Sequence, residues 1–115
     1  MRTALPMLAL LWLAADLTGA WTLDLDPDFG GIRSSVDCTF KHDGTKLTVD
    51  CGNGPTIAGE LDGRKVTLRV KTGQNNELTA SFIGDLDARE TTITGAWQLT
   101  DRDGKREGKF TATKR

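Results

Sequence analysis

The sequence has little of what most catalytic and metal sites are built from. Its 115 residues include one histidine, two cysteines and no tyrosine. A zinc or thiol redox site needs closely spaced cysteines or several histidines, whereas His42 stands alone in a predicted turn. The acidic residues fall in turns or on the outward face of predicted strands, where no apolar pocket adjusts a carboxylate for acid–base work. We therefore predict a non-catalytic protein without a metal or other cofactor.

The chain also has no large excess of charge of either sign. The 15 basic and 16 acidic residues nearly cancel, and the two signs alternate along the chain without forming a stripe. A protein that binds nucleic acid needs a basic surface to neutralise phosphates. The balance of charge therefore predicts no nucleic-acid partner.

Long apolar runs are absent except near the N-terminus. Arg2 precedes an apolar run over 5–15, and 18–20 (Thr-Gly-Ala) supplies a small-residue cleavage pattern, which together are typical of a secretory signal. The run is shorter than the roughly 18 to 20 residues that cross a bilayer, so an uncleaved anchor is the less favoured alternative. We predict a signal peptide over 1–20 and a secreted or periplasmic protein that is not held in a membrane after cleavage.

The cleavage point is open between residues 15 and 20. With cleavage after Ala20, the third residue before the cleaved bond is Thr18, which is the more suitable residue at that position. Cleavage after Ala15 would instead leave Asp16 and Leu17 in the mature chain. Residues 21–115 are predicted to form a single domain.

Period-two alternation dominates the rest of the chain. Apolar residues fall on one face and Thr, Lys, Arg, Asp, Glu, Ser and Gln on the other, which predicts half-buried strands rather than helices. The predicted strands cover residues 21–25, 36–41, 46–51, 56–61, 65–71, 77–86, 92–100 and 108–113.

Turn chemistry then predicts how these strands connect. Asp43-Gly44 and Asp62-Gly63 are strong hairpin signals, and the other connections are short as well. Short links place each strand antiparallel beside the one before it. The fold class is therefore all-β, an eight-stranded antiparallel up-and-down meander that closes into a barrel.

The hairpin at Asp43-Gly44 also places the two cysteines. It sets Phe40 opposite Val49 and Cys38 opposite Cys51 on neighbouring strands. An even number of cysteines in an exported chain favours a disulfide, and closing this loop would stabilise the fold by about 3 kcal/mol.

Trp21 opens the first predicted strand, and Lys114 lies in phase with the inward positions of the last. With these features the chain resembles the calycin barrels, the group of lipocalins, fatty-acid-binding proteins and avidins. The stretch 93–100 is also similar to a late strand of avidin-like barrels. The resemblance implies a basic side chain, Lys114 or Arg115, over Trp21. Biotin binding is disfavoured, because avidins use tyrosine and other inward polar groups that this chain lacks. The pattern I-x-G-x-L-D-G followed by K-V-T-L is also similar to small exported bacterial β-barrel proteins without an assigned activity.

The predicted apolar interior suggests that the barrel binds a small molecule. An eight-stranded barrel is just wide enough to be filled by its own side chains, so we expect a largely filled interior with an apolar pocket at one mouth. A small hydrophobic ligand there would contact Phe40, Phe82 and Trp97. The long irregular stretch 26–35 would act as a lid over one barrel end or as a contact loop.

The alternative is a protein-binding module, such as an exported protease inhibitor. The stretch 15–23 resembles the A-x-L-x-G-x-W-x-L pattern that opens some small disulfide-bearing periplasmic inhibitors. In those proteins the inhibitory segment precedes that pattern. A mature chain that began at Trp21 would carry no such segment.

Overall fold

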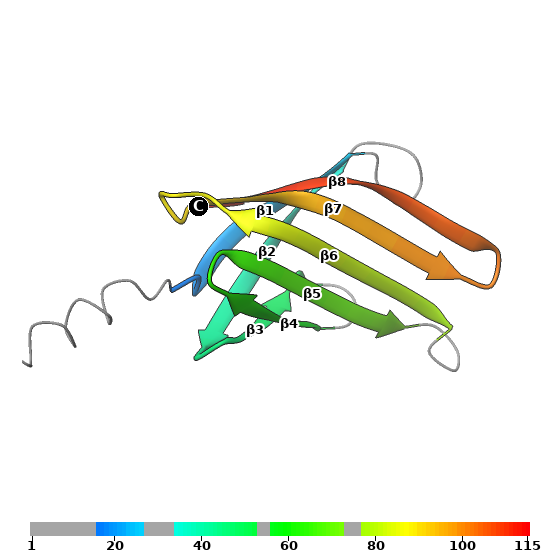
Figure 1. Ribbon diagram of the computed structural model, residues 1–115, viewed down its shortest axis with the longest axis horizontal. Coiled ribbons are helices and arrows are strands. Elements are labelled where there is room, and N and C mark those ends of the chain that lie inside the picture. The colour runs from blue at the N-terminus through cyan, green and yellow to red at the C-terminus, as the bar shows by residue number, and fades with distance from the viewer. Residues whose placement is uncertain (1–15, 27–33, 53–55, 73–76) are drawn as a thin grey trace, which may run out of the picture.

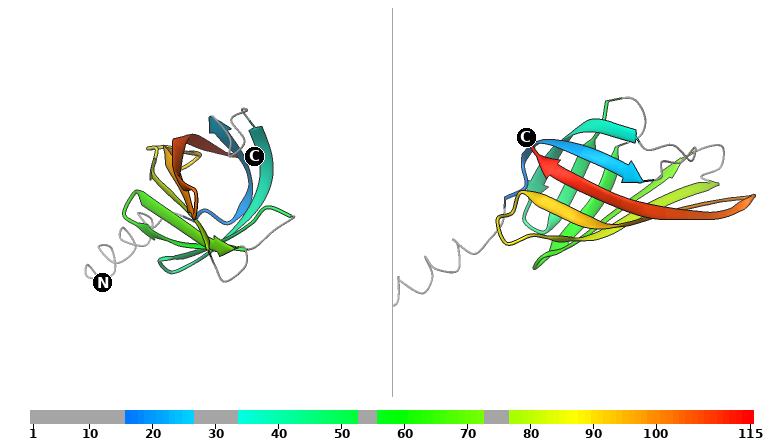
Figure 2. Two further views of the ribbon diagram at one scale, coloured as in Figure 1. Left: turned by 90° about the vertical axis from the view of Figure 1, so that its right-hand side faces the viewer. Right: turned by 90° about the horizontal axis from the view of Figure 1, so that it is seen from above.

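The computed structural model describes residues 16–26, 34–52, 56–72 and 77–115. Each of its eight strands pairs antiparallel with the next, and the last pairs back with the first, so the sheet closes into a barrel (Figures 1 and 2). This confirms the predicted fold class. None of the described residues form a helix long and apolar enough to span a membrane. The strands are β1 (Gly19–Asp26), β2 (Ser34–Asp43), β3 (Lys46–Asp50), β4 (Ile57–Asp62), β5 (Lys65–Thr72), β6 (Leu78–Leu86), β7 (Thr92–Asp101) and β8 (Gly104–Lys114).

The strands are staggered as a narrow barrel requires. Trp21 of β1 is paired with Cys38 of β2 on one side and with Lys114 of β8 on the other. Directly paired residues can be followed from strand to strand in a row that runs from β2 to β8. The row starts four positions after Cys38 and ends six positions before Lys114. The two offsets add up to a stagger of ten residues around the barrel. Such a stagger tilts the strands and leaves an interior that side chains can fill. The row is His42, Leu47, Gly59, Leu68, Phe82, Trp97 and Gly108.

The inward residues of all eight strands form one apolar cluster. Trp21, Phe40, Trp97 and Phe110 are among the largest side chains in it, and each is at most 2 % exposed. The inward phase is the one that period-two alternation predicts. Burial of aromatic side chains of this size supplies much of the stability of so small a domain.

Glycine at two inward positions lets neighbouring strands approach closely. Gly95 of β7 is paired with Gly84 of β6, and a Cβ on Gly95 would overlap the Ile83 carbonyl oxygen and the Gly84 Cα. A Cβ on Gly108 would lie 2.7 Å from Nε1 of Trp97, because the indole occupies the space over that glycine. These glycines therefore make room for aromatic rings and for a tightly coiled sheet.

The predicted disulfide is confirmed. Cys38 and Cys51 are bonded across β2 and the end of β3, one position beyond the paired residues Thr39 and Asp50. Both cysteines of the chain are used, so no free thiol is left. A disulfide is the expected state in an oxidising extracellular or periplasmic environment.

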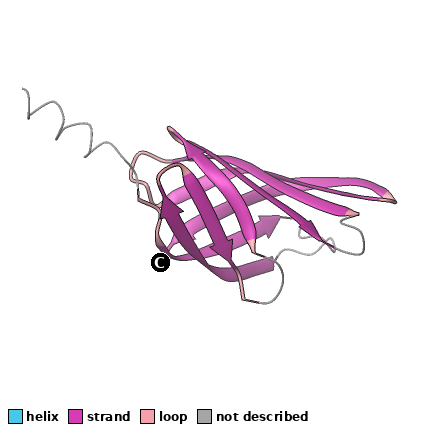
Figure 3. Cartoon of the chain, turned by 90° about the horizontal axis from the view of Figure 1, so that it is seen from below, coloured by secondary structure: helices cyan, strands magenta, loops and turns pink. Residues whose placement is uncertain are grey.

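The structure differs from the predicted elements by one or two residues at several strand ends, and three differences matter for the ends of the barrel. Strand β1 begins at Gly19, before the expected Trp21, because the preceding residues also pair with β2. Strand β8 begins at Gly104 and not at residue 108, because its polar first half pairs with β7 in a long hairpin that projects past the other strands (Figures 1 and 3). The placement of His42 in a turn was wrong, since it lies within β2 opposite Leu47. The apolar run up to residue 15 and most of the stretch 26–35 lie outside the described residues.

Removing the disulfide should lower the free energy of unfolding by about 3 kcal/mol, because the bond closes a loop with a sequence separation of 13 residues. The double variant C38A/C51A and the parent are compared by urea unfolding with and without reductant. Reductant should destabilise the parent by a similar amount and leave the variant unchanged. Equal stability of parent and variant without reductant would contradict the prediction.

Gly95→Ala should destabilise the barrel by about 2 to 3 kcal/mol, because the new methyl group overlaps the backbone of β6. Ala96→Ser is the matched control, since Ala96 is the next residue of β7 and is exposed on the outer face. Thermal unfolding of the three proteins measures the effect. Equal losses in the two variants would mean that the approach of β6 and β7 is not tight at Gly95.

Candidate functional site

The two ends of the barrel are built differently. We call the end where β1 starts and β8 finishes the Leu17 end, and the end where β1, β3, β5 and β7 finish the loop end. Among the described residues, the partly buried apolar side chains that pack against the core all lie near strand termini at the loop end. They are Val36, Cys51, Ile57, Val70 and Leu78.

The Leu17 end is sealed by the residues that precede β1. Leu17 is fully buried, and its carbonyl oxygen accepts a hydrogen bond of 2.8 Å from Nε1 of Trp21. Its backbone N–H donates to Nδ1 of His42 at 3.1 Å. Nδ1 is the acceptor in this bond, and Nε2 is buried with no hydrogen-bond partner among the described residues. The His42 side chain is only 6 % exposed and acts here as a structural group.

The basic cover expected over Trp21 is present only in part. Lys114 does lie beside Trp21 on the neighbouring strand. Its ammonium group, however, reaches the carbonyl oxygen of Asp16 at 3.5 Å, and the indole N–H is taken by Leu17. The hydrogen-bond acceptor for the indole N–H of Trp21 therefore comes from the N-terminal segment.

The three predicted ligand-contacting aromatics fall into two groups. Phe82 and Trp97 are directly paired on β6 and β7, and Phe82 meets Phe110 edge-on with ring centroids 5.4 Å apart. Phe40 is instead stacked on Trp21, with centroids 4.9 Å apart. Phe40, Phe82 and Trp97 are each at most 3 % exposed. All three are core residues, and we call the partly exposed apolar residues at the loop end the rim.

A polar pair stands on one side of this rim. Arg106 of β8 follows the inward phase of Gly108 and Phe110, and its guanidinium lies 3.7 Å from the carboxylate of Asp101. Both side chains are partly exposed. The phase of Arg106 could have been read from the sequence, but the predicted strand started only at residue 108. A second ion pair joins Arg102 and Glu77 at the same end, so the loop end combines an apolar rim with two ion pairs.

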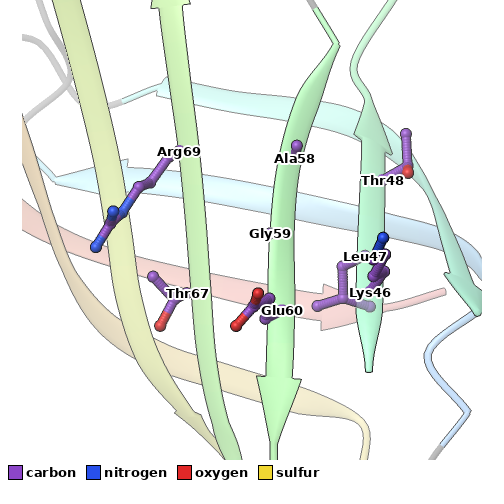
Figure 4. Close-up of a pocket in the computed structure, with 8 residues that line it drawn as sticks. All are labelled: Lys46, Leu47, Thr48, Ala58, Gly59, Glu60, Thr67 and Arg69. Atoms are coloured by element: carbon purple, nitrogen blue, oxygen red, sulfur yellow. The ribbon is translucent and has the colours of Figure 1, made fainter. Parts of the chain in front are cut away.

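The outer wall of the barrel carries a shallow groove of about 610 Å³ across β3, β4 and β5 (Figure 4). A Cβ on Gly59 would overlap the Thr67 carbonyl oxygen, so β4 and β5 approach closely and the sheet bends there. In Figure 4 the Arg69 side chain extends away from β4, which leaves the space over Ala58 open. The groove is lined by Lys46, Leu47, Thr48, Ala58, Gly59, Glu60, Thr67 and Arg69.

Apart from the histidine His42, the ionisable groups of the described residues lie at the surface. No Asp, Glu, Lys or Arg is buried in these segments, and no three His, Cys, Asp or Glu side chains of the described part could hold a metal ion together. The pKa of Asp16 is lowered mainly because its carboxylate accepts the Thr18 backbone N–H. The pKa of Asp87 is lowered mainly by the backbone N–H of Thr91 in the β6–β7 turn.

Comparison with known proteins adds no relative. No protein-family model, curated protein or solved structure matches the chain.

Asp87→Asn should remove part of the acid sensitivity of folding. A lowered folded-state pKa means that the carboxylate stabilises the fold fully above its ordinary pKa of 3.8, and that this contribution is lost as the pH falls through the folded value. The variant should therefore be less stable than the parent at pH 7, and the difference should shrink below about pH 4. Urea unfolding between pH 2 and pH 7 measures it. The control Asp85→Asn removes an exposed carboxylate outside this turn, and an identical pH profile for both variants would contradict the role of Asp87.

Proposed function

We propose that the protein is an exported, non-catalytic barrel of the calycin type that binds a small, largely apolar molecule at the loop end. The observation that carries the proposal is the position of the partly buried apolar residues, all of which lie at this end, while Leu17 seals the other. Apolar surface that stays partly exposed in one place is typical of a binding site.

The chemistry of the rim suggests what kind of molecule would bind. Val70, Leu78 and Ile57 offer apolar contacts, and the Arg106–Asp101 pair offers a hydrogen-bonding edge. A molecule with an apolar body and one small polar group would satisfy both. The nearly balanced charge of the chain gives no support to a nucleic-acid partner.

Export is supported by two observations. The N-terminal sequence has the pattern of a secretory signal, and the Cys38–Cys51 disulfide suits an oxidising compartment. We accordingly propose a secreted or periplasmic location.

A protein-binding role is the second candidate, and the outer groove across β3 to β5 is the feature that favours it. Its floor at Ala58 and Gly59 is small, and Lys46, Glu60 and Arg69 supply charges of both signs at its rim. At this groove β4 is paired with β3 on one side and with β5 on the other, so a partner would dock there through side chains. In the inhibitor version of this role, the inhibitory segment would have to precede residue 16, because Leu17 is already held inside the barrel end.

The ligand proposal predicts that Val70→Arg weakens binding of an apolar probe by about tenfold or more, because it places a charge on the apolar rim. Ile83→Arg is the matched control, since Ile83 is 46 % exposed on the outer face. Titration with the uncharged apolar probe N-phenyl-1-naphthylamine, together with organic extraction and mass spectrometry of the purified parent, makes the measurement. Thermal unfolding verifies that both variants are folded.

The outcomes separate the two candidates. Binding that is lost in Val70→Arg and kept in Ile83→Arg supports the loop-end site. A parent that yields no extracted molecule and leaves the probe unbound contradicts it and favours the protein-binding role. Equal loss in the two variants also contradicts a site at the loop end.

A further inference from the structure

The residues immediately before β1 are part of the folded barrel. Leu17 is fully buried, and both of its backbone polar groups are used inside the barrel end, by His42 Nδ1 at 3.1 Å and by Trp21 Nε1 at 2.8 Å. Burial of a leucine side chain of this kind is worth roughly as much as that of a core residue on a strand. Leu17 is therefore a structural member of the domain, although the sequence pattern assigns it to the signal peptide.

Its neighbours extend the same attachment. The Thr18 hydroxyl accepts the backbone N–H of His42 at 3.2 Å, and the Thr18 N–H donates to the Asp16 carboxylate at 3.0 Å. The Asp16 carbonyl oxygen accepts from Nζ of Lys114 at 3.5 Å. Contacts between 16–18 and the barrel thus come from both β2 and β8.

The first two residues of β1 would be lost with a cleavage after Ala20. Gly19 and Ala20 are paired with Phe40 and Thr39 of β2, and the Ala20 carbonyl oxygen accepts the backbone N–H of Arg115 at 2.9 Å. A chain starting at Trp21 would lose all of these bonds.

In such a chain, buried side chains at this barrel end would also lose their hydrogen-bond partners. The indole N–H of Trp21 and Nδ1 of His42 would each lose the hydrogen bond they make to Leu17, and unpaired buried polar groups are costly. A new ammonium group would stand on Trp21, a residue that is completely buried, where a charge is disfavoured. Cleavage after Ala15 removes none of the described contacts.

We infer that the mature protein begins at Asp16, and that residues 16–18 remain as a permanent plug of the barrel end. Hydrolysis of the Ala15–Asp16 peptide bond by a signal peptidase consumes one water, leaving a carboxylate on Ala15 and an ammonium group on Asp16. The inference rests on the proposed export and is independent of any ligand. It selects between the two cleavage points that the sequence leaves open, and it selects the one with the less favourable upstream residue.

The test is made on the full chain, expressed with its own N-terminus in a bacterium that exports it. N-terminal sequencing and intact mass of the processed protein should show a start at Asp16. Two matched variants locate the cleaved bond, because a signal peptidase requires a small residue before the cut. Ala15→Leu should accumulate as the precursor, whereas Ala20→Leu, a change at an exposed outer position of β1, should be processed like the parent.

The opposite results would overturn the inference. A mature chain that starts at Trp21, or accumulation of the Ala20→Leu precursor with normal processing of Ala15→Leu, would show that the plug is removed. A parent that keeps Met1 would overturn the proposed export itself, and the inferred start with it. That outcome is recognised separately by its intact mass, whatever the ligand experiment shows.

Discussion

The pairing of β1 with β8 is the constraint on which the rest of the structure depends. Every strand is apolar on one face, and a sheet with that pattern must hide the face and both of its edges. Trp21 sits where closure occurs, between Cys38 and Lys114, and it is completely buried. The close approach of β6 and β7 at Gly95 and the disulfide at Cys51 both help a small sheet to coil tightly enough for β1 to pair with β8.

Closure leaves two ends, and the chain treats them differently. At one end the N-terminal segment turns inward, and the backbone of Leu17 forms hydrogen bonds with Nδ1 of His42 and with Nε1 of Trp21. At the other end the strands finish at different heights. Apolar residues such as Val70 stay partly exposed there, and Arg106 pairs with Asp101 across β7 and β8. The asymmetry of the two ends is the basis of the proposed function.

The fold could be predicted from the sequence, but the grouping of residues at a site could not. Alternation with period two identifies the inward face, and the Asp43-Gly44 hairpin fixes the register that bonds Cys38 to Cys51. Alternation with period two does not tell where a residue lies along the barrel axis. That position depends on the stagger of ten residues that accumulates over the eight strands. For that reason Phe40 was grouped with Phe82, although it stacks on Trp21. Leu17 was missed for another reason, since a leucine close to an apolar signal run carries no local mark of a strand.

The most direct test of the account is to map where an apolar probe binds. Amide chemical shifts of the uniformly labelled protein are recorded by nuclear magnetic resonance during a titration with anilinonaphthalene sulfonate. The account predicts that the shifts of Val36, Ile57, Val70 and Leu78 change with the probe concentration, while those of Leu17 and the other residues at the sealed end stay constant. Changes confined to the Leu17 end or to the outer groove around Ala58 would contradict it.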